Sequence, residues 1–461
     1  MIYDVIVLGG GPGGYHAALE GTKNQLKTVL IEQEFIGGTC LKEGCIPTKI
    51  LLKSAEVFEM VKSSEVFGVS VENITYNHQI TIQRKNALIQ QLNRGVISKL
   101  KKANVEIVQG FGELVGKEAG NIKVVCNGKY YEAKHLVIST GSSPNWPPIP
   151  GLKEAVEAQF ALNSTQMLNV MELPEKLVII GGGVIGIEFA EVFNKLGSEV
   201  EIIEFQQTIG GPIDIDMSCA LQEMLEAREI RVVTNARVTK IKSGALEYTQ
   251  DGKVYETAAS KVLVSTGRGG NISTIGLESL GIEVERGFIK TDEKCATNIP
   301  NIYAIGDVNG RSMLAHTAYR EAEVAIQCIL GNKVRMNYNA IPSVIYTSPE
   351  MASVGFTTAQ AQEKGLEVKE ITVPLYYSGR FLIEESDSTS FIKVLIDERY
   401  KTIVGVHLLA PFASEIIFGM TILVEQQMRI EDLKRVVIPH PSIAEILNEV
   451  VTIYEKEAVF L

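Results

Sequence analysis

Two cysteines near the N-terminus are spaced so that they could open and close a disulfide. Cys40 and Cys45 are five positions apart, and closely spaced cysteines in a reducing compartment indicate redox chemistry or metal binding. An ideal helix would separate such positions by about 7.5 Å along its axis, beyond the roughly 4.4–6.8 Å Cα separation of a disulfide. We therefore expect a distorted turn. Gly44 relaxes the backbone there, and Pro47 cannot donate a helical hydrogen bond back to Glu43.

The alternatives for this pair are a structural disulfide and half of a zinc site. A reducing compartment argues against the first, and no second pair of cysteines or histidines occurs to complete the second. We therefore expect no metal. The remaining cysteines are isolated in the sequence and are expected to be buried apolar thiols: Cys126, Cys219, Cys295 and Cys328.

A redox pair needs a base, because only a thiolate attacks a disulfide. His440 is the best candidate, since a helix after Pro441 could turn Glu445 back to orient the imidazole. Taken alone, a histidine between prolines is more often structural. The other histidines have no comparable carboxylate setting: His16, His78, His135, His316 and His407.

Two glycine-rich turns could each hold a dinucleotide. In the first glycine turn, Gly9, Gly11 and Gly14 supply the sharp bend, the close approach of a pyrophosphate and the helix-on-strand packing. The N-terminus of the following helix stabilises the anion. Glu32, at the end of the next strand, is placed to accept hydrogen bonds from a ribose diol.

The second glycine turn repeats this arrangement with Gly181, Gly183, Gly186 and Glu204. A ribose 2′-phosphate would be repelled by Glu204 and would need nearby arginines, but no cation follows before Arg228. The sequence therefore favours NAD(H) over NADP(H). The alternative is a structural duplicate that binds no ligand.

Strands and helices that alternate around these turns predict two doubly wound α/β units and a separate C-terminal α+β domain. A proline-rich stretch at 144–150 marks a boundary between the units. The expected strands are Tyr3–Leu8, Thr28–Glu32, Leu177–Ile180, Glu199–Glu204, Asn301–Asp307, Ser343–Tyr346, Phe391–Ile396 and Ile403–Leu409. The expected helices are Tyr15–Asn24, Thr48–Phe67, Thr81–Asn104, Ile187–Leu196 and Ala413–Met428.

Bulk composition excludes several classes of function. The chain has 461 residues, 45% of them hydrophobic, and a formal net charge of −11. An acidic chain disfavours contact with nucleic-acid phosphates. The apolar run at Ile2–Leu8 is too short for a membrane span and lacks the basic flank of a signal peptide. We expect a cytoplasmic protein that contacts neither nucleic acid nor membrane.

Taken together, these residues resemble the class I pyridine nucleotide–disulfide oxidoreductases along essentially the whole chain. The redox signature is the most specific of the matches. The matching segments, in order, are Gly37-Gly38-Thr39-Cys40, Gly44-Cys45-Ile46-Pro47-Thr48-Lys49, Ser139-Thr140-Gly141, Ser265-Thr266-Gly267-Arg268, Ala304-Ile305-Gly306-Asp307, and His440-Pro441 to Glu445.

The resemblance implies which cofactor each unit binds. It places FAD in the first unit and NAD in the second, with Cys45 next to the flavin, Cys40 exchanging with substrate, and Glu188 as the ionic partner of Lys49. The implied FAD residues are Gly9, Gly11, Gly14, Glu32, Lys49, Gly112, Ser139, Thr140, Gly141, Asp307, Met313, Leu314, Ala315 and His316. The implied NAD residues are Gly181, Gly183, Gly186, Glu188, Glu204, Val238 and Gly267.

The resemblance also implies a homodimer in which His440 serves the disulfide of the other subunit. The expected domains are 1–145 for the first part of the FAD-binding domain, 146–268 for the NAD-binding domain, 269–342 for the second, central part, and 343–461 for the interface (dimerisation) domain. No lipoyl domain lies in the sequence, so a lipoyl-bearing carrier protein is expected on a separate polypeptide.

Within the family, Gly11-Pro12-Gly13-Gly14-Tyr15 is similar to the enzymes that oxidise protein-bound dihydrolipoamide with NAD⁺, for a 2-oxoacid dehydrogenase or glycine cleavage complex. Two rivals remain, namely a related NAD(P)H-dependent flavoprotein disulfide reductase with another thiol substrate, and a subunit that keeps the fold without turnover. The chain departs from the usual pattern at Lys42-Glu43 and at Val436-Val437-Ile438. A carboxylate at Glu43 could disfavour a nearby thiolate.

Overall fold

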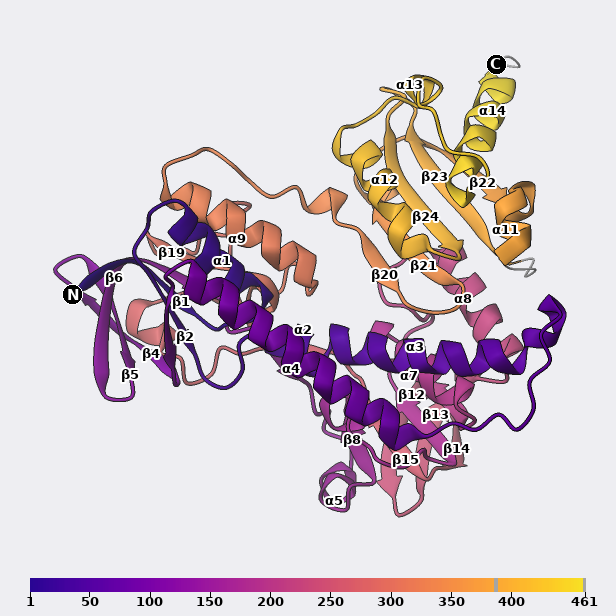
Figure 1. The fold of residues 1–461 in the computed structure, drawn as a ribbon, viewed down its shortest axis with the longest axis horizontal. Helices are drawn as coiled ribbons and strands as arrows, with labels where there is room; N and C mark the ends of the chain where they lie inside the picture. The colour runs from indigo at the N-terminus through magenta and orange to yellow at the C-terminus, as the bar shows by residue number, and fades with distance from the viewer. Residues whose placement is uncertain (385–388, 459–461) are drawn as a thin grey trace.

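The computed structural model describes residues 1–384 and 389–458, and Figure 1 shows three lobes joined along the chain. The interface domain expected at 343–461 contains the positions outside this description, 385–388 and 459–461. No helix in the described ranges is both long enough and apolar enough to cross a membrane.

The first lobe is built on a seven-stranded sheet with the order β3-β2-β1-β6-β5-β4, and β19 pairs with β6. Strands β1, β2, β3, β6 and β19 run parallel, whereas β4 and β5 form an antiparallel extension. The strands are β1 (Ile2–Leu8), β2 (Thr28–Glu32), β3 (Glu106–Gln109), β4 (Gly112–Glu118), β5 (Asn121–Cys126), β6 (Lys129–Ile138) and β19 (Ile302–Ala304).

Alternate residues of β1 enter two different cores, because successive side chains of a strand point to opposite faces of the sheet. Val5 and Val7 pack with residues of α1 (Pro12–Lys23) and α9 (Ala315–Ile329), and Ile6 packs with the β4–β5 face. Both faces of the strand are therefore covered, which explains why nearly every residue of β1 is apolar.

A helical excursion leaves the first sheet after β2. It consists of α2 (Gly38–Glu43), α3 (Cys45–Lys62), the short turn η1 (Ser64–Phe67) and α4 (His78–Lys102). The two long helices extend from the first lobe to the second, where α3 packs on α7 (Val184–Lys195) (Figure 1). The helix expected at 48–67 therefore begins earlier than predicted, at Cys45, and its last turn is the separate η1.

The second lobe contains a five-stranded parallel sheet with the order β11-β10-β9-β15-β8. An antiparallel three-stranded sheet, β12-β13-β14, lies beside it and was not expected from the sequence. The strands are β8 (Ala161–Asn163), β9 (Lys176–Ile180), β10 (Glu199–Ile203), β11 (Arg231–Val233), β12 (Ala236–Lys242), β13 (Ala245–Gln250), β14 (Lys253–Ala258) and β15 (Lys261–Val264). The helices are α5 (Leu152–Glu157), α6 (Ser164–Met167), α7 and α8 (Ile215–Ala227).

The chain enters and leaves the second lobe at one place. Strand β7 (Ser142–Pro144) pairs antiparallel with β16 (Arg268–Gly270), so that Ser142 lies opposite Gly270. After β16 the chain returns to the first sheet through β17 (Val284–Glu285), β18 (Phe288–Ile289) and β19. The second lobe is therefore an insertion into the first. The boundaries predicted at 145/146, 268/269 and 342/343 remain predictions.

The third lobe is an antiparallel sheet with the order β20-β21-β24-β23-β22 and helices packed against it. The helix expected at 413–428 ends earlier, at Glu425. The strands are β20 (Ser343–Ile345), β21 (Glu350–Gly355), β22 (Val368–Pro374), β23 (Phe391–Asp397) and β24 (Ile403–Ala410). The helices are α10 (Thr358–Glu363), α11 (Gly379–Glu384), α12 (Ala413–Glu425), α13 (Ile430–Leu433) and α14 (Ile446–Ala458).

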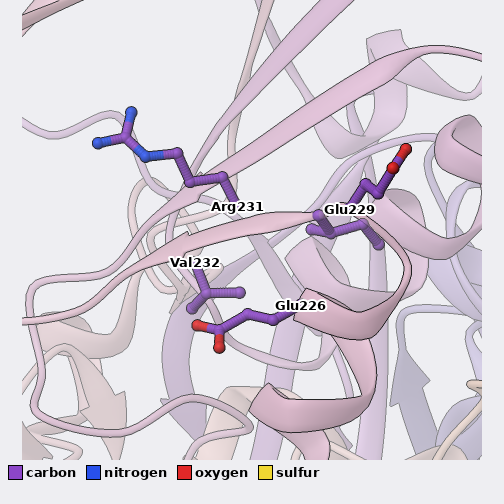
Figure 2. A pocket seen from close by; sticks show the side chains of 5 residues that line it. Glu226, Glu229, Arg231 and Val232 are labelled. Carbon is purple, nitrogen blue, oxygen red and sulfur yellow. The ribbon is translucent and has the colours of Figure 1, made fainter.

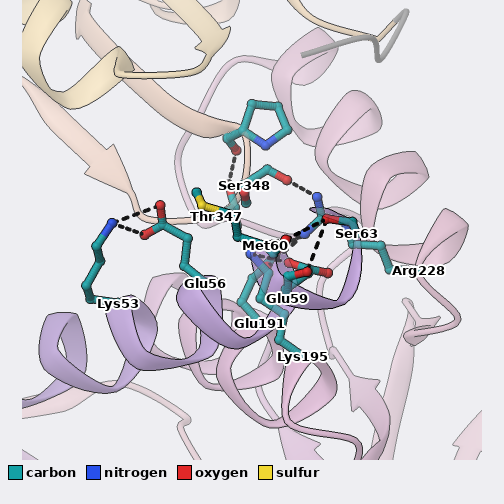
Figure 3. A network of polar contacts seen from close by, with 11 residues as sticks. Lys53, Glu56, Glu59, Met60, Ser63, Glu191, Lys195, Arg228, Thr347 and Ser348 are labelled. Carbon is teal, nitrogen blue, oxygen red and sulfur yellow. Dashed lines mark hydrogen bonds and ion pairs between the residues drawn. The ribbon is translucent and has the colours of Figure 1, made fainter. Parts of the chain in front are cut away.

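A buried ionic network joins the three lobes (Figure 3). Lys195 of α7 lies 3.0 Å from Glu59 of α3 and 3.3 Å from Glu191. Arg228, just after α8, pairs with Glu191 at 3.0 Å and donates to the carbonyl oxygen of Ser348, between β20 and β21. Because Glu191 and Lys195 are both buried, the loss of one partner would leave an uncompensated charge. The network therefore fixes α3 against the second and third lobes.

Candidate active site

The helix that carries the two cysteines is interrupted between them, as the spacing predicted. Helix α2 ends at Glu43, and Gly44 has φ −144° and ψ −106°, outside the helical region. Helix α3 then begins at Cys45. The interruption shortens the separation that a continuous helix would impose on the sulfur atoms.

Cys40 and Cys45 are both half-buried thiols in this structure, and they hydrogen-bond to each other. The hydrogen bond from Cys40, assisted by the positive charge of Lys49, lowers the pKa of the Cys45 thiol below its ordinary value. The same hydrogen bond, together with burial, raises the pKa of Cys40. In the reduced pair a hydrogen bond donated by Cys40 therefore favours the thiolate form of Cys45.

Lys49 lies one turn after Cys45 on α3 and is held by Glu188 of α7. Its Nζ atom is 2.8 Å from each carboxylate oxygen and lies 4.1 Å from the centre of the Tyr346 ring. Glu188 is buried and also accepts a hydrogen bond from the Tyr346 backbone at 3.2 Å. Residues from all three lobes thus hold the Lys49 charge in place near Cys45.

Substitution of Lys49 and substitution of Glu188 should shift the pKa of Cys45 in opposite directions. Lys49→Gln deletes a cation that lowers the pKa, so the pKa should rise. Glu188→Gln deletes an anion that raises it, so the pKa should fall. The pH dependence of iodoacetamide alkylation of Cys45 in the reduced protein measures both shifts, and trypsin cleavage at Lys42 separates the two cysteines for mass spectrometry. Shifts of the same sign would contradict this electrostatic account.

The unusual Lys42-Glu43 pair between the cysteines is engaged in its own contacts. Lys42 lies 3.0 Å from Glu34 and 3.1 Å from Glu43. Thr165 of α6 donates to the second oxygen of Glu43 at 3.3 Å. The Glu43 carboxylate therefore links α2 to the second lobe.

The first glycine turn has the shape that a pyrophosphate requires. Gly9 has φ +94°, and a Cβ atom there would collide with the carbonyl oxygen of Ser139. At Gly14 a Cβ atom would collide with the carbonyl oxygen of Gly9. No side chain caps α1 at Gly11, and Glu32 accepts a hydrogen bond from Gly10 at 2.5 Å. An uncapped helix N-terminus beside a fixed carboxylate fits FAD binding here.

The other residues expected around the flavin fall into three groups. Ser139 and Thr140 hydrogen-bond to the backbone at Gly9 and Asn271, whereas Gly141 has open space where a Cβ atom would lie. Asp307 accepts a hydrogen bond from Ser142 at 2.5 Å. Met313 and Leu314 precede α9, which begins at Ala315, and His316 lies 2.7 Å from the carbonyl oxygen of Pro342.

Gly112 contributes close packing. A Cβ atom at this position would lie 2.7 Å from a methyl group of Leu8 and 3.2 Å from Ile31. The glycine therefore lets β4 approach the strands that carry the first glycine turn, and its role toward FAD remains a prediction.

The second glycine turn opens into a cavity of about 840 Å³. Gly181, Gly183, Glu204, Val238 and Gly267 line it. Thr266 also lines it, and its buried hydroxyl has no hydrogen-bond partner in the described part of the chain. No side chain caps α7 at Gly183, where a Cβ atom would meet open space. These features fit a dinucleotide.

Two of the residues expected at NAD lie outside this lining. Gly186 packs the first turn of α7 on the glycine turn itself, where a Cβ atom would collide with the carbonyl oxygen of Gly181. Glu188 points to Lys49, as described above. A smaller groove of about 270 Å³ at the edge of the second sheet is lined by Glu226, Glu229, Ile230, Arg231 and Val232 (Figure 2), none of which the sequence assigned to a site.

His440 and Glu445 form the pair expected from the sequence. The Nδ1 atom of His440 lies 2.8 Å from a carboxylate oxygen of Glu445. The His440 side chain is 80% exposed and that of Glu445 18%. The imidazole is therefore oriented from its Nδ1 side and open to another molecule on its Nε2 side.

Three expectations about individual residues were wrong. His16 does contact a carboxylate, because Glu323 of the neighbouring α9 lies 3.3 Å from its ring. Cys219 is exposed and Cys328 only half-buried, since Cys219 faces away from the apolar side of α8. A cation does line the cavity beside Glu204, because strand β12 brings Arg237 there. Glu323 and Arg237 are both distant in sequence from the residues they approach.

The sequence also gave no role to two tyrosines near Cys40. The hydroxyl groups of Tyr15 on α1 and Tyr319 on α9 lie 2.5 Å apart. Burial raises the pKa of both phenols. The position of Tyr15 directly after Gly14 was the only sequence signal. The described residues contain no group of metal ligands.

Comparison with known proteins agrees with this architecture. Residues 3–322 match the pyridine nucleotide-disulphide oxidoreductase family, and residues 341–451 match its dimerisation domain. The dihydrolipoyl dehydrogenase of Bacillus subtilis is 35% identical, over 99% of this chain and 99% of its own.

Two solved structures are similar over nearly the whole chain. LpdA of Mycobacterium tuberculosis has a TM-score of 0.88 and 25% identity, and the match covers 97% of this chain and 99% of LpdA. The HOCl-induced flavoprotein disulfide reductase RclA of Escherichia coli has a TM-score of 0.85 and 26% identity, over 98% and 99%. The protein described here is therefore an FAD- and NAD-dependent member of the pyridine nucleotide-disulphide oxidoreductase family.

Proposed function

We propose that this protein is a dihydrolipoyl dehydrogenase, which oxidises a protein-bound dihydrolipoyl group to its disulfide and reduces NAD⁺ to NADH. The observation that carries the proposal is the Cys40–Cys45 pair, in which the Lys49 charge helps to hold the thiolate on Cys45. Full-length similarity to a dihydrolipoyl dehydrogenase supports the choice of substrate.

The oxidised cysteine pair accepts the electrons of the substrate. One substrate thiolate attacks the sulfur of Cys40, which breaks the Cys40–Cys45 bond and releases Cys45 as a thiolate. The second substrate thiolate then displaces Cys40 from the mixed disulfide. The substrate leaves as a disulfide, and the enzyme holds two electrons as the Cys40–Cys45 dithiol. The lowered pKa of Cys45 makes it the better leaving group.

We assign His440 as the base that removes the substrate proton, with Glu445 as the residue that orients it. The 2.8 Å contact through Nδ1 leaves Nε2 for the proton transfer. The high exposure of His440 supports a role at the active site of a partner subunit, and the match to the dimerisation domain supports a homodimer.

The proposed cofactor sites follow the two glycine turns. Gly9, Gly11, Gly14, Glu32 and the flavin-side residues named above would hold FAD, and the cavity of the second turn would hold NAD. FAD held there would supply the two-electron chemistry that connects the Cys40–Cys45 dithiol to NAD⁺. Ser139 fixes the turn through the carbonyl oxygen of Gly9, Thr140 donates to Asn271, and Asp307 presents a carboxylate held by Ser142.

We further propose that the protein works in the cytoplasm with a lipoyl-bearing carrier protein of a 2-oxoacid dehydrogenase or glycine cleavage complex. The predicted domain boundaries, 1–145, 146–268, 269–342 and 343–461, stand as part of the proposal. The insertion of the second lobe between β7 and β16 supports the first two of them.

The decisive experiment is an assay of the purified holoenzyme with dihydrolipoamide and NAD⁺. We expect NADH formation that saturates with both substrates, in the typical kcat range of 1–10³ s⁻¹. The same preparation is tested for NAD(P)H oxidation with glutathione disulfide as the acceptor. Activity on glutathione disulfide without activity on dihydrolipoamide would overturn the proposal and favour a reductase of another thiol. No turnover in either assay would favour a subunit without catalysis.

A further inference from the structure

An arginine that follows Glu204 only at a distance in sequence lies next to it in the cavity of the second glycine turn. The backbone segments 204–206 and 235–236 hydrogen-bond to each other, from Ala236 to Glu204 and from Asn235 to Gln206, both at 2.9 Å. Arg237, the next residue on β12, lines the same cavity as Glu204 and Phe205. The two opposite charges therefore share one end of the dinucleotide cavity.

The two charged side chains differ in the partners they already have. Glu204 accepts hydrogen bonds on both oxygens, from the backbone of Gly182 at 2.5 Å and of Gln206 at 2.6 Å. Arg237 forms no ion pair with any residue in 1–384 or 389–458, and its guanidinium lies 5.9 Å from the centre of the Phe205 ring. Both Arg237 and Phe205 are exposed to solvent.

This arrangement bears on the ribose 2′-position. A carboxylate at the end of the second strand of such a unit accepts hydrogen bonds from a ribose diol, whereas a 2′-phosphate in the same place requires a cation. An exposed guanidinium without a carboxylate partner is suited to binding phosphate, because its planar set of N–H donors matches the phosphate oxygens.

We propose that Arg237 is a latent binding site for the 2′-phosphate of NADP(H), and that the preference of this chain for NAD(H) rests on the charge of Glu204 alone. The inference rests on the proposed binding of NAD in this cavity and goes beyond it. Arg237 attracts the 2′-phosphate while Glu204 repels it. Loss of the Glu204 charge should therefore increase the affinity for a 2′-phosphate, through its attraction to Arg237.

The test compares the binding of adenosine 5′-monophosphate and adenosine 2′,5′-bisphosphate to the holoenzyme by isothermal titration calorimetry. These probes differ only in the 2′-phosphate, so the ratio of their affinities isolates it. We expect Glu204→Gln to raise the preference for the bisphosphate by about 10-fold or more, and Arg237→Gln to lower it by a similar factor, as for one charge-assisted hydrogen bond. In Glu204→Gln/Arg237→Gln the gain should disappear.

Lys240→Gln is the matched control, because Lys240 is an exposed cation on the same strand that does not line the cavity. It should leave the affinity ratio unchanged, and Arg237→Lys should keep part of the gain. Glu204→Ser repeats the test should the Gln variant fold poorly, and a wild-type content of bound FAD confirms an intact fold. The inference would be overturned if Glu204→Gln and Glu204→Gln/Arg237→Gln had the same ratio of bisphosphate to monophosphate affinity.

Steady-state assays with NAD⁺ and NADP⁺ provide a second measurement. The value of kcat/KM for NADP⁺ should rise in the Glu204 variants and fall back in the double variant. Failure to oxidise dihydrolipoamide would count against the proposed function only, because the calorimetric ratio does not depend on turnover.

Discussion

Cys45→Ser is expected to lower the oxidation of dihydrolipoamide by NAD⁺ by at least about 10⁴-fold, the scale of loss on removing a covalent nucleophile. The variant cannot form the disulfide that accepts the electrons of the substrate. Cys45 is half-buried, and serine differs from cysteine by one atom, so the fold and the FAD content should be retained. The measurement is NADH formation per bound flavin.

Cys219→Ser is the matched control, because Cys219 is exposed on α8 and takes no part in the redox pair. It should keep wild-type activity. Full activity in Cys45→Ser would remove the cysteine pair from the electron path. Loss of bound FAD together with activity would instead assign Cys45 a structural role in the first lobe.

His440→Gln should lower kcat by about 10²–10⁴-fold at neutral pH, the usual contribution of a general base. Glu445→Gln should have a smaller effect, because the imidazole stays in place and loses only the carboxylate 2.8 Å from its Nδ1 atom. Raising the pH should recover part of the activity of His440→Gln, since the substrate thiol then ionises without help. Unchanged kcat in His440→Gln would exclude it as the base.

Mixed dimers determine which subunit His440 serves. In a heterodimer of Cys45→Ser and His440→Gln, a site shared between subunits leaves one active site with both substitutions and the other with neither. We therefore expect the heterodimer, isolated with two different affinity tags, to have about half the wild-type activity, although each parent homodimer is nearly inactive. An inactive heterodimer would place His440 at the disulfide of its own subunit.

The sequence predicted those parts of the fold and site that depend on local pattern. Each glycine turn carries its own strand, helix and acidic residue within a short stretch, and Gly44 lies at the break between α2 and α3. The neighbouring His440 and Glu445 could be paired in the same way, because a helical turn separates them. Such features need only the chain geometry of a few residues.

The rest depends on contacts between distant segments. Arg237 lines the same cavity as Glu204 only because the chain returns to Glu204 at the start of β12, and Tyr319 meets Tyr15 only because α9 packs on α1. The sheet β12-β13-β14 is an exception, because its two-residue turns, Ser243-Gly244 and Asp251-Gly252, are local hairpin signals that the sequence analysis did not use. Whether His440 crosses to a partner depends on assembly, which no spacing along the chain records.

The ribbon of β7 and β16 is a place where the second lobe could be exchanged for another domain. Because Ser142 and Gly270 are paired, the inserted lobe interrupts the first one at a single point of its surface. Closely spaced ends are the condition under which a domain can be inserted without disturbing its host. A gene fragment for another nucleotide-binding unit could therefore be exchanged at this ribbon, and Arg268, which donates to both the hydroxyl and the carbonyl oxygen of Ser142 at 2.7 Å, is the residue that such a chimaera would have to keep.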